Sequence, residues 1–206
     1  VIAVLVSAIS KTSKKALITL IGIWLLFTII LPRTTQAIGA YIYEAPSKIQ
    51  FTSDIEKDIL KQGDSHNPND PHYKAIKDSL LSAYKVDSVQ KLPFNYSGFI
   101  MTEGEKISSR IYNEHLAELL QVYKKQNSFS KTVSFLNPYI AMKNLSMGLS
   151  NTDYESYVDF QQQAEDYRYM MAQKMNALQI KYISNKKPSA GDKPYSISKE
   201  HWSDVE

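Results

Sequence analysis

Residues 63–73, GDSHNPNDPHY, hold the densest group of side chains in the chain that could do chemistry. Two carboxylates and two imidazoles lie there, at Asp64, His66, Asp70 and His72. Carboxylate oxygen and imidazole nitrogen are common ligands of divalent metals. Their spacing matches no metal motif, however, and Asn, Asp and Pro are also the residues that form turns and begin helices. We therefore expect this stretch to shape a loop and a helix start, and we assign no metal ligand in it.

The rest of the chain lacks the sequence motifs of common catalytic and nucleotide-binding sites. It contains no G-x-x-x-x-G-K-[ST] loop, no G-x-S-x-G and no H-E-x-x-H. It has no cysteine, which excludes disulfides, thiolate metal sites and cysteine nucleophiles. His115 and His201 are isolated in the sequence, and we expect each to be a surface or packing residue. We predict no catalytic residue, no cofactor and no enzymatic activity of the chain itself.

An apolar run near the start of the chain predicts a membrane helix. Residues 16–32 are seventeen consecutive residues without a charge, and large apolar side chains cover every face of the helix that they would form. At about 1.5 Å per residue this helix is about 26 Å long. That length approaches the ~30 Å hydrocarbon core, and Lys14 and Lys15 can extend it by snorkelling. A buried helix of a soluble protein is seldom apolar all round.

A cleaved signal peptide is the main alternative to a permanent span. Lys11, Lys14 and Lys15 resemble a basic n-region, and residues 37–39 (Ala-Ile-Gly) form a tolerable cleavage site. Against this, the apolar run is longer than a typical h-region, and residues 1–10, VIAVLVSAIS, are apolar themselves. We therefore favour a permanent transmembrane helix over residues 16–32, with residues 1–10 as the end of a preceding membrane helix.

The charge distribution predicts which side of the membrane each part occupies. Three lysines in residues 11–15 precede the span, and only Arg33 follows it closely, so the positive-inside rule places 11–15 in the cytoplasm and 33–206 outside. All 21 acidic residues follow the span, and the three lysines account for the net charge of +3. The outer part is therefore neutral, and we expect no nucleic-acid partner.

Helical signals dominate the outer part, for which we predict an all-α fold over residues 33–183. Residues 33–43 continue the membrane helix, and apolar spacing predicts a short helix that ends at Gly63. Four further helices are expected. The first begins at Asp70-Pro71, and Tyr73, Ile76, Leu80 and Tyr84 follow on one helical face. The second runs over about 103–135, the third begins at Asn137-Pro138 and ends near Gly148, and the fourth begins with a capping box over 152–155. Residues 86–99 are expected to be a connection, because Pro93 and Gly98 interrupt the helical pattern there. Residues 184–206 are expected to be a polar linker towards the membrane.

Two stretches of the outer part leave alternatives open. Tyr157, Phe160, Ala164, Tyr167 and Met171, continued by Met175, Leu178 and Tyr182, form a coiled-coil-like apolar seam. The seam can pack within a helical bundle, which we favour, or form a dimer contact. Residues 135–153 can be a core helix, which we favour, or an amphipathic helix on the membrane surface.

The sequence also resembles a known family. The stretches HNPNDPHYKAIKDSLLSAYKVDSVQKLPFNYSG (66–98), LNPYIAMKNLSMGLSNTD (136–153) and FQQQAEDYRYMMAQKMN (160–176) are similar to the extracytoplasmic domain of bacterial ABC-2 type transporter permeases. Residues 7–33 resemble the membrane helix that enters that domain, and residues 199–206 the approach to the returning helix. The resemblance implies a multi-pass inner-membrane protein with a large helical outer domain of uncharacterised function.

The resemblance further implies partners. The chain would be part of the permease subunit of an ATP-driven exporter, with ATP hydrolysis on a separate cytoplasmic subunit. It would work as a homodimer or pair with a related permease. The alternative is a membrane-anchored sensor or receptor with a periplasmic helical bundle, which shares the single entering span and the long paired helices.

Overall fold

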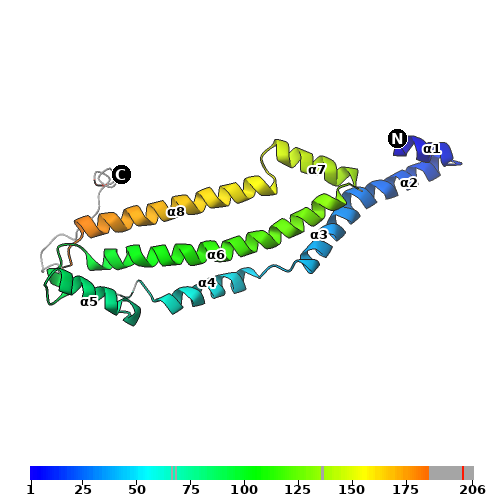
Figure 1. The fold of residues 1–206 in the computed structure, drawn as a ribbon. Helices are drawn as coiled ribbons and strands as arrows, with labels where there is room; N and C mark the ends of the chain where they lie inside the picture. Colours follow the sequence, from blue (N-terminus) through cyan, green and yellow to red (C-terminus); the bar gives the residue numbers. More distant parts are fainter. Residues whose placement is uncertain (66, 68, 136, 186–200, 202–206) are drawn as a thin grey trace, which may run out of the picture. The chain divides into compact units, whose positions relative to one another are not determined.

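The computed structural model describes residues 1–65, 67, 69–135, 137–185 and 201, and every regular element among them is helical (Figure 1). The predicted fold class, an apolar membrane-type helix followed by an all-α region, is confirmed. Contacts divide the chain into two compact units. Unit 1 comprises Val1–Pro46 and Glu118–Phe160, and unit 2 comprises Ser47–Ala117 and Gln161–Glu206. We describe each unit by itself.

Unit 1 begins with the apolar helices. The short helix α1 (Ile2–Ile9) is followed by α2 (Ser13–Leu25), a π-helical turn η1 (Leu26–Ile30) and α3 (Leu31–Ile42). The last three are continuous, and over Ser13–Ile42 they form one helix long and apolar enough to cross a membrane. The predicted span over 16–32 lies within it, and the predicted continuation beyond Arg33 is confirmed.

Pro32 explains the π-helical turn. The Leu31 N–H donates to the carbonyl of Leu26, five residues back, and Pro32 has no N–H to continue the pattern. The carbonyl of Phe27, five residues before Pro32, therefore has no backbone donor at that spacing. Asn137 supplies one, because its Nδ2 donates to the Phe27 oxygen at 2.9 Å.

Asn137 also begins α7 (Pro138–Leu149), as the sequence predicts. Its Oδ1 accepts from the N–H groups of Tyr139 at 3.0 Å and Ile140 at 3.4 Å, and the residue is fully buried. α7 ends one residue beyond the predicted Gly148. The side chain of Asn137 thus joins the start of α7 to the middle of the membrane-type helix.

The start of α8 (Tyr154–Tyr182) differs from the predicted capping box over 152–155. Asp153 is the cap, since its Oδ1 accepts from the Ser156 N–H at 3.2 Å. The Thr152 hydroxyl is engaged elsewhere and donates to the carbonyl of Met147 at 3.4 Å, at the end of α7. The capping residue is therefore one position later than the motif indicated.

The prediction that residues 135–153 form a core helix is wrong for most of the apolar side chains of this helix. Ile140 is the buried residue of α7, at 4% exposed. Four other large apolar side chains of this helix are 43–81% exposed: Tyr139, Met142, Leu145 and Leu149. They lie on the side away from Ile140, because their spacing of three, three and four places them on one face.

Unit 2 holds α4 (Lys48–Gln62), the 3₁₀ turns η2 (Pro71–Tyr73) and η3 (Val89–Lys91), α5 (Lys74–Ala83), the first part of α6 (Tyr96–Val133) and the last part of α8. Its core is a cluster of four buried residues, Tyr73, Leu92, Tyr96 and Ile100, on which Ile76 and Leu80 of α5 also pack. The predicted helical face of α5 is confirmed at these positions.

The long helix α6 begins seven residues before the predicted 103. Asn95 caps it by accepting the Gly98 N–H at 2.7 Å. Gly98, which the sequence suggested as a break, lies inside the helix because a Cβ there would be only 3.1 Å from the backbone nitrogen of Ile180. Within unit 2, α6 and α8 lie side by side (Figure 1), and the glycine permits that approach.

The apolar seam of α8 is not the face that packs within the chain. Tyr157, Phe160, Tyr167 and Met175 are 46–66% exposed, so the intramolecular interpretation is wrong for them, while Leu178 is fully buried. In unit 2, polar side chains make contacts between α8 and α6 instead: the Gln173 amide donates to the carbonyl of Thr102 at 3.1 Å. The dimer interpretation of the seam stays a prediction.

Candidate functional site

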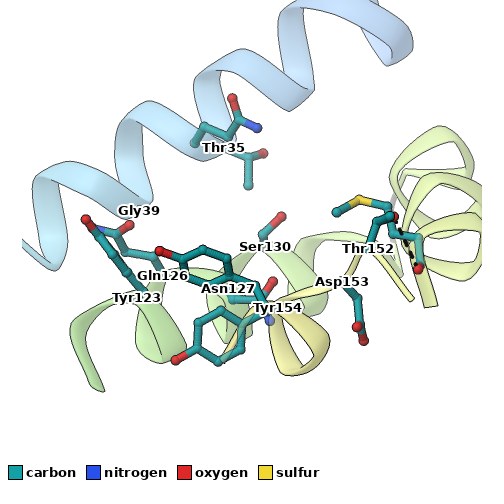
Figure 2. Close-up of a pocket in the computed structure, with 12 residues that line it drawn as sticks. Thr35, Gly39, Tyr123, Gln126, Asn127, Ser130, Thr152, Asp153 and Tyr154 are labelled. Carbon is teal, nitrogen blue, oxygen red and sulfur yellow. Dashed lines mark hydrogen bonds between the residues drawn. The ribbon is translucent and has the colours of Figure 1, made fainter. Parts of the chain in front are cut away.

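A cleft of about 470 Å³ lies within unit 1, and we call it the polar cleft (Figure 2). α3, α6, the end of α7 and the start of α8 form its walls. The side chains of Thr35 on α3 and of Asn127 and Ser130 on α6 lie around it, with Tyr154 coming from α8. The lining residues are Thr35, Gln36, Gly39, Tyr123, Gln126, Asn127, Ser130, Met147, Thr152, Asp153, Tyr154 and Tyr157.

Side-chain hydrogen bonds hold the walls of the polar cleft together. Gln126 on α6 donates through Nε2 to the carbonyl of Tyr43 at 2.6 Å, just past the end of α3. The Tyr154 hydroxyl of α8 donates to the carbonyl of Leu120 on α6 at 2.6 Å. Both bonds satisfy backbone carbonyls with side chains from another helix, and together they fix α3 and α8 against α6.

The chemistry of the polar cleft is that of neutral hydrogen-bonding groups. Asp153 is the one carboxylate among the twelve lining residues, and no Lys, Arg or His is among them. Its Oδ1 accepts from the hydroxyl of Ser156 at 2.7 Å and from the Ser156 N–H, and these bonds lower the pKa of Asp153. The carboxylate is therefore ionised at neutral pH and occupied as a helix cap. The lining offers hydroxyls and amides but no pairing of a nucleophile with a base.

The structure gives the 63–73 stretch the turn and capping role that we expected. Oδ1 of Asp70 accepts from the backbone N–H of His72 at 2.9 Å and lies 2.7 Å from its Nδ1. Oδ2 accepts from the N–H of Asp64 at 3.0 Å. These bonds, that from the His72 backbone first, lower the pKa of Asp70. His66 lies outside the described residues, and among those described no group of three or more His, Asp or Glu could hold a metal.

The two isolated histidines both lie against other side chains. Nε2 of His115 on α6 is 2.9 Å from Oδ2 of Asp58 on α4, and the Lys61 ammonium, followed by His115, lowers the pKa of Asp58. The ring of His201 lies 4.3 Å from that of Tyr182. Both contacts agree with the prediction that each histidine is a surface or packing residue. The partner of His115 could not be predicted, because 57 positions separate it from Asp58.

A partly exposed ionic cluster in unit 2 is not among the sites that the sequence predicts. Arg168 donates to Glu165 through Nε at 2.8 Å and Nη2 at 2.7 Å. Its Nη1 also forms an ion pair with Glu105 on α6, 2.7 Å from Oε1. The two carboxylates raise the pKa of Arg168 above its ordinary value. The cluster fixes α8 to α6, and the spacing of Glu165 and Arg168 is its one local sequence signal.

Comparison with known proteins places most of the chain in one family model. A model described as a domain of unknown function, DUF3526, matches residues 48–205. The match covers all of α4 to α8 and leaves the apolar helices before them unmatched. Searches of curated proteins and of solved structures gave no match.

Proposed function

We propose a transport role for this chain, which belongs to the family of the domain of unknown function DUF3526. In this proposal the chain is part of the permease subunit of an ABC-2 type, ATP-driven exporter. Support comes from the resemblance of residues 66–98, 136–153 and 160–176 to such permeases. Among the described residues, the helix Ser13–Ile42, which is long and apolar enough to cross a membrane, also supports it.

The observation that carries the proposal is the continuity between this helix and the polar cleft. Thr35, Gln36 and Gly39 line the cleft, and they lie on α3, directly beyond the uncharged run 16–32. No loop separates the two parts within Ser13–Ile42. A displacement of the membrane helix therefore displaces a wall of the cleft. This is the coupling that a permease needs between its membrane helices and its outer domain.

The neutral lining of the polar cleft fits a passage better than a catalytic centre. Hydroxyl and amide groups can contact water or a polar solute without holding it as tightly as a charge would. We propose that the outer domain gates or guides the exit of a substrate. The free energy for uphill transport then comes from a partner, because the chain carries no phosphate-binding glycine loop.

Purification of the full-length protein in mild detergent tests the proposal. We expect a cytoplasmic nucleotide-binding subunit to co-purify, the complex to hydrolyse ATP and the permease alone to be inactive. We also expect two permease copies, or one copy with a related permease, in each complex. A full-length protein that carries its own kinase or methyl-accepting module, with no associated ATPase, would support the sensor alternative instead.

A further inference from the structure

A second cavity of unit 1, of about 560 Å³, lies between the membrane-type helix and α7. We call it the basic groove. η1 and α3 supply one wall, and the first two turns of α7 supply the other. The lining residues are Thr28, Ile29, Pro32, Arg33, Gln36, Tyr139 and Lys143.

The charge of the basic groove has one sign. Arg33 and Lys143 line it from opposite walls, and none of its lining residues is acidic. Within the part of the chain that the structure describes, no carboxylate lies within 4 Å of either cation. Other cations of the described chain do form ion pairs with Asp or Glu, among them Lys57, Lys61, Lys91, Lys106, Lys131 and Arg168. Guanidinium and ammonium groups that share a groove without a counter-charge favour an anion, and phosphate oxygens suit both.

The position of Arg33 along the span places this charge near the outer surface of the membrane. If the hydrocarbon core begins at Ala16, after the last cytoplasmic lysine, Arg33 lies about 26 Å further along the helix. The core is about 30 Å thick, and a long basic side chain reaches several ångströms along the helix towards the interface. The guanidinium thus reaches the level of the outer phosphate groups, where an anionic lipid presents its headgroup.

The second wall is fixed to the membrane-type helix and leads to an apolar surface. The bond from Asn137 to the Phe27 carbonyl fixes the start of α7 against the membrane-type helix. Tyr139 lines the groove, and from it Met142, Leu145 and Leu149 continue along the exposed face of α7. A free phosphate ion would use only the two cations. A lipid would use these cations together with the apolar face, because its acyl chains extend from the headgroup.

We propose that the basic groove binds the phosphate of an anionic lipid headgroup, with the acyl chains along the exposed apolar face of α7. Arg33 and Lys143 are the residues that select the charge. The site depends on the membrane span that the proposed function also requires, but it does not depend on transport or on an ATPase.

Lipid titration of the purified full-length protein, without any ATPase subunit, tests this site. The probe is phosphatidylglycerol, compared by native mass spectrometry with phosphatidylcholine of the same acyl chains. A basic residue near an anionic lipid contributes about 1 kcal/mol to the binding free energy. R33Q and K143Q should therefore each weaken phosphatidylglycerol binding about fivefold, and the double variant should weaken it about thirtyfold. Lys125→Gln is the matched control, because Lys125 is an exposed cation of unit 1 outside the groove. The control should bind like the parent.

Four other outcomes would overturn the assignment. Equal binding of the two lipids, or an equal effect of K125Q and R33Q, would show that the two cations do not select the headgroup. Displacement of the lipid by millimolar inorganic phosphate would identify a free anion as the ligand. Loss of the protein from the membrane fraction would refute the span itself. If no ATPase subunit associates but the protein still prefers phosphatidylglycerol, only the proposed function is refuted and the lipid site stands.

Discussion

Replacing Asn137 by alanine should release α7 from the membrane-type helix. The substitution removes the cap that Oδ1 provides to Tyr139 and Ile140, which is worth about 1 kcal/mol. It also removes the Nδ2 donor and leaves the Phe27 carbonyl without its partner, at about 1–3 kcal/mol. The combined loss of about 2–4 kcal/mol corresponds to at least about thirtyfold more frequent opening of α7.

Amide hydrogen exchange of the α7 peptides, measured by mass spectrometry in detergent, reports this opening directly. N137A should accelerate exchange over residues 138–149 by at least about thirtyfold. Asn144→Ala, on the same helix and without a side-chain hydrogen bond in the described structure, is the control and should leave exchange nearly unchanged. N137D keeps an acceptor for the cap but loses the donor, so its effect should lie between the two.

A double-mutant cycle with Pro32→Ala isolates the bond to Phe27. Alanine at position 32 restores an N–H and lets the helix return to α-helical spacing, in which the Phe27 carbonyl accepts from Leu31. Asn137→Ala should then cost about 1–3 kcal/mol less than in the parent. Equal costs in both backgrounds, or equal exchange in N137A and N144A, would refute the idea that Asn137 satisfies a carbonyl freed by Pro32.

Three further predictions concern unit 2. A Cβ at Gly104 would overlap the Cβ of Ser65, so Gly104→Ala should lower stability by about 1–3 kcal/mol in thermal unfolding. The control G148A, on α7 of unit 1 and with open space around it, should not; equal melting temperatures would contradict the close approach. Arg168→Met leaves Glu165 and Glu105 without their cation and should destabilise the chain by about 1–3 kcal/mol, a figure reduced because Arg168 is half exposed. Adding Glu165→Gln should recover part of that loss, and a fully additive loss in the double variant would count against the cluster. Hydrogen bonds lower the pKa of Asp70 in the folded chain, so its contribution to stability is present above about pH 4 and is lost as the pH falls through the lowered pKa. After correction for the intrinsic effect of pH on amide exchange, acid should therefore lower the protection factors over 64–74, and D70N should remove that pH dependence.

Local sequence signals located most helices because helix formation depends on neighbours in the chain. The start at Asn137-Pro138, the helical face of α5 and the apolar run before Arg33 are all local patterns, and the structure contains each of them. The seam of α8 shows where this fails. Its apolar period is real, but the face that packs within the chain carries Glu165, Arg168 and Gln173, and hydropathy cannot identify a packed polar face.

The sites depend on pairings between distant positions, which no local pattern contains. Asn137 meets Phe27 across 110 positions, and Arg168 on α8 meets Glu105 on α6. The residues of the polar cleft are ordinary hydroxyls and amides that carry no motif. The capping residues show a related limit, since Thr152 and Asp153 are both good caps and only the end of α7 decides between them.

The placement of the chain across the membrane is the central claim, and fusions to a reporter that is active only outside the cytoplasm test it most directly. A fusion after Ser13 lies before the uncharged run 16–32, and a fusion after Gly63 lies beyond α3 and α4. The account predicts an inactive reporter at Ser13 and an active one at Gly63, with the Gly63 fusion in the membrane fraction at full length. The reverse pattern, or a Gly63 fusion released in soluble form after cleavage, would contradict it.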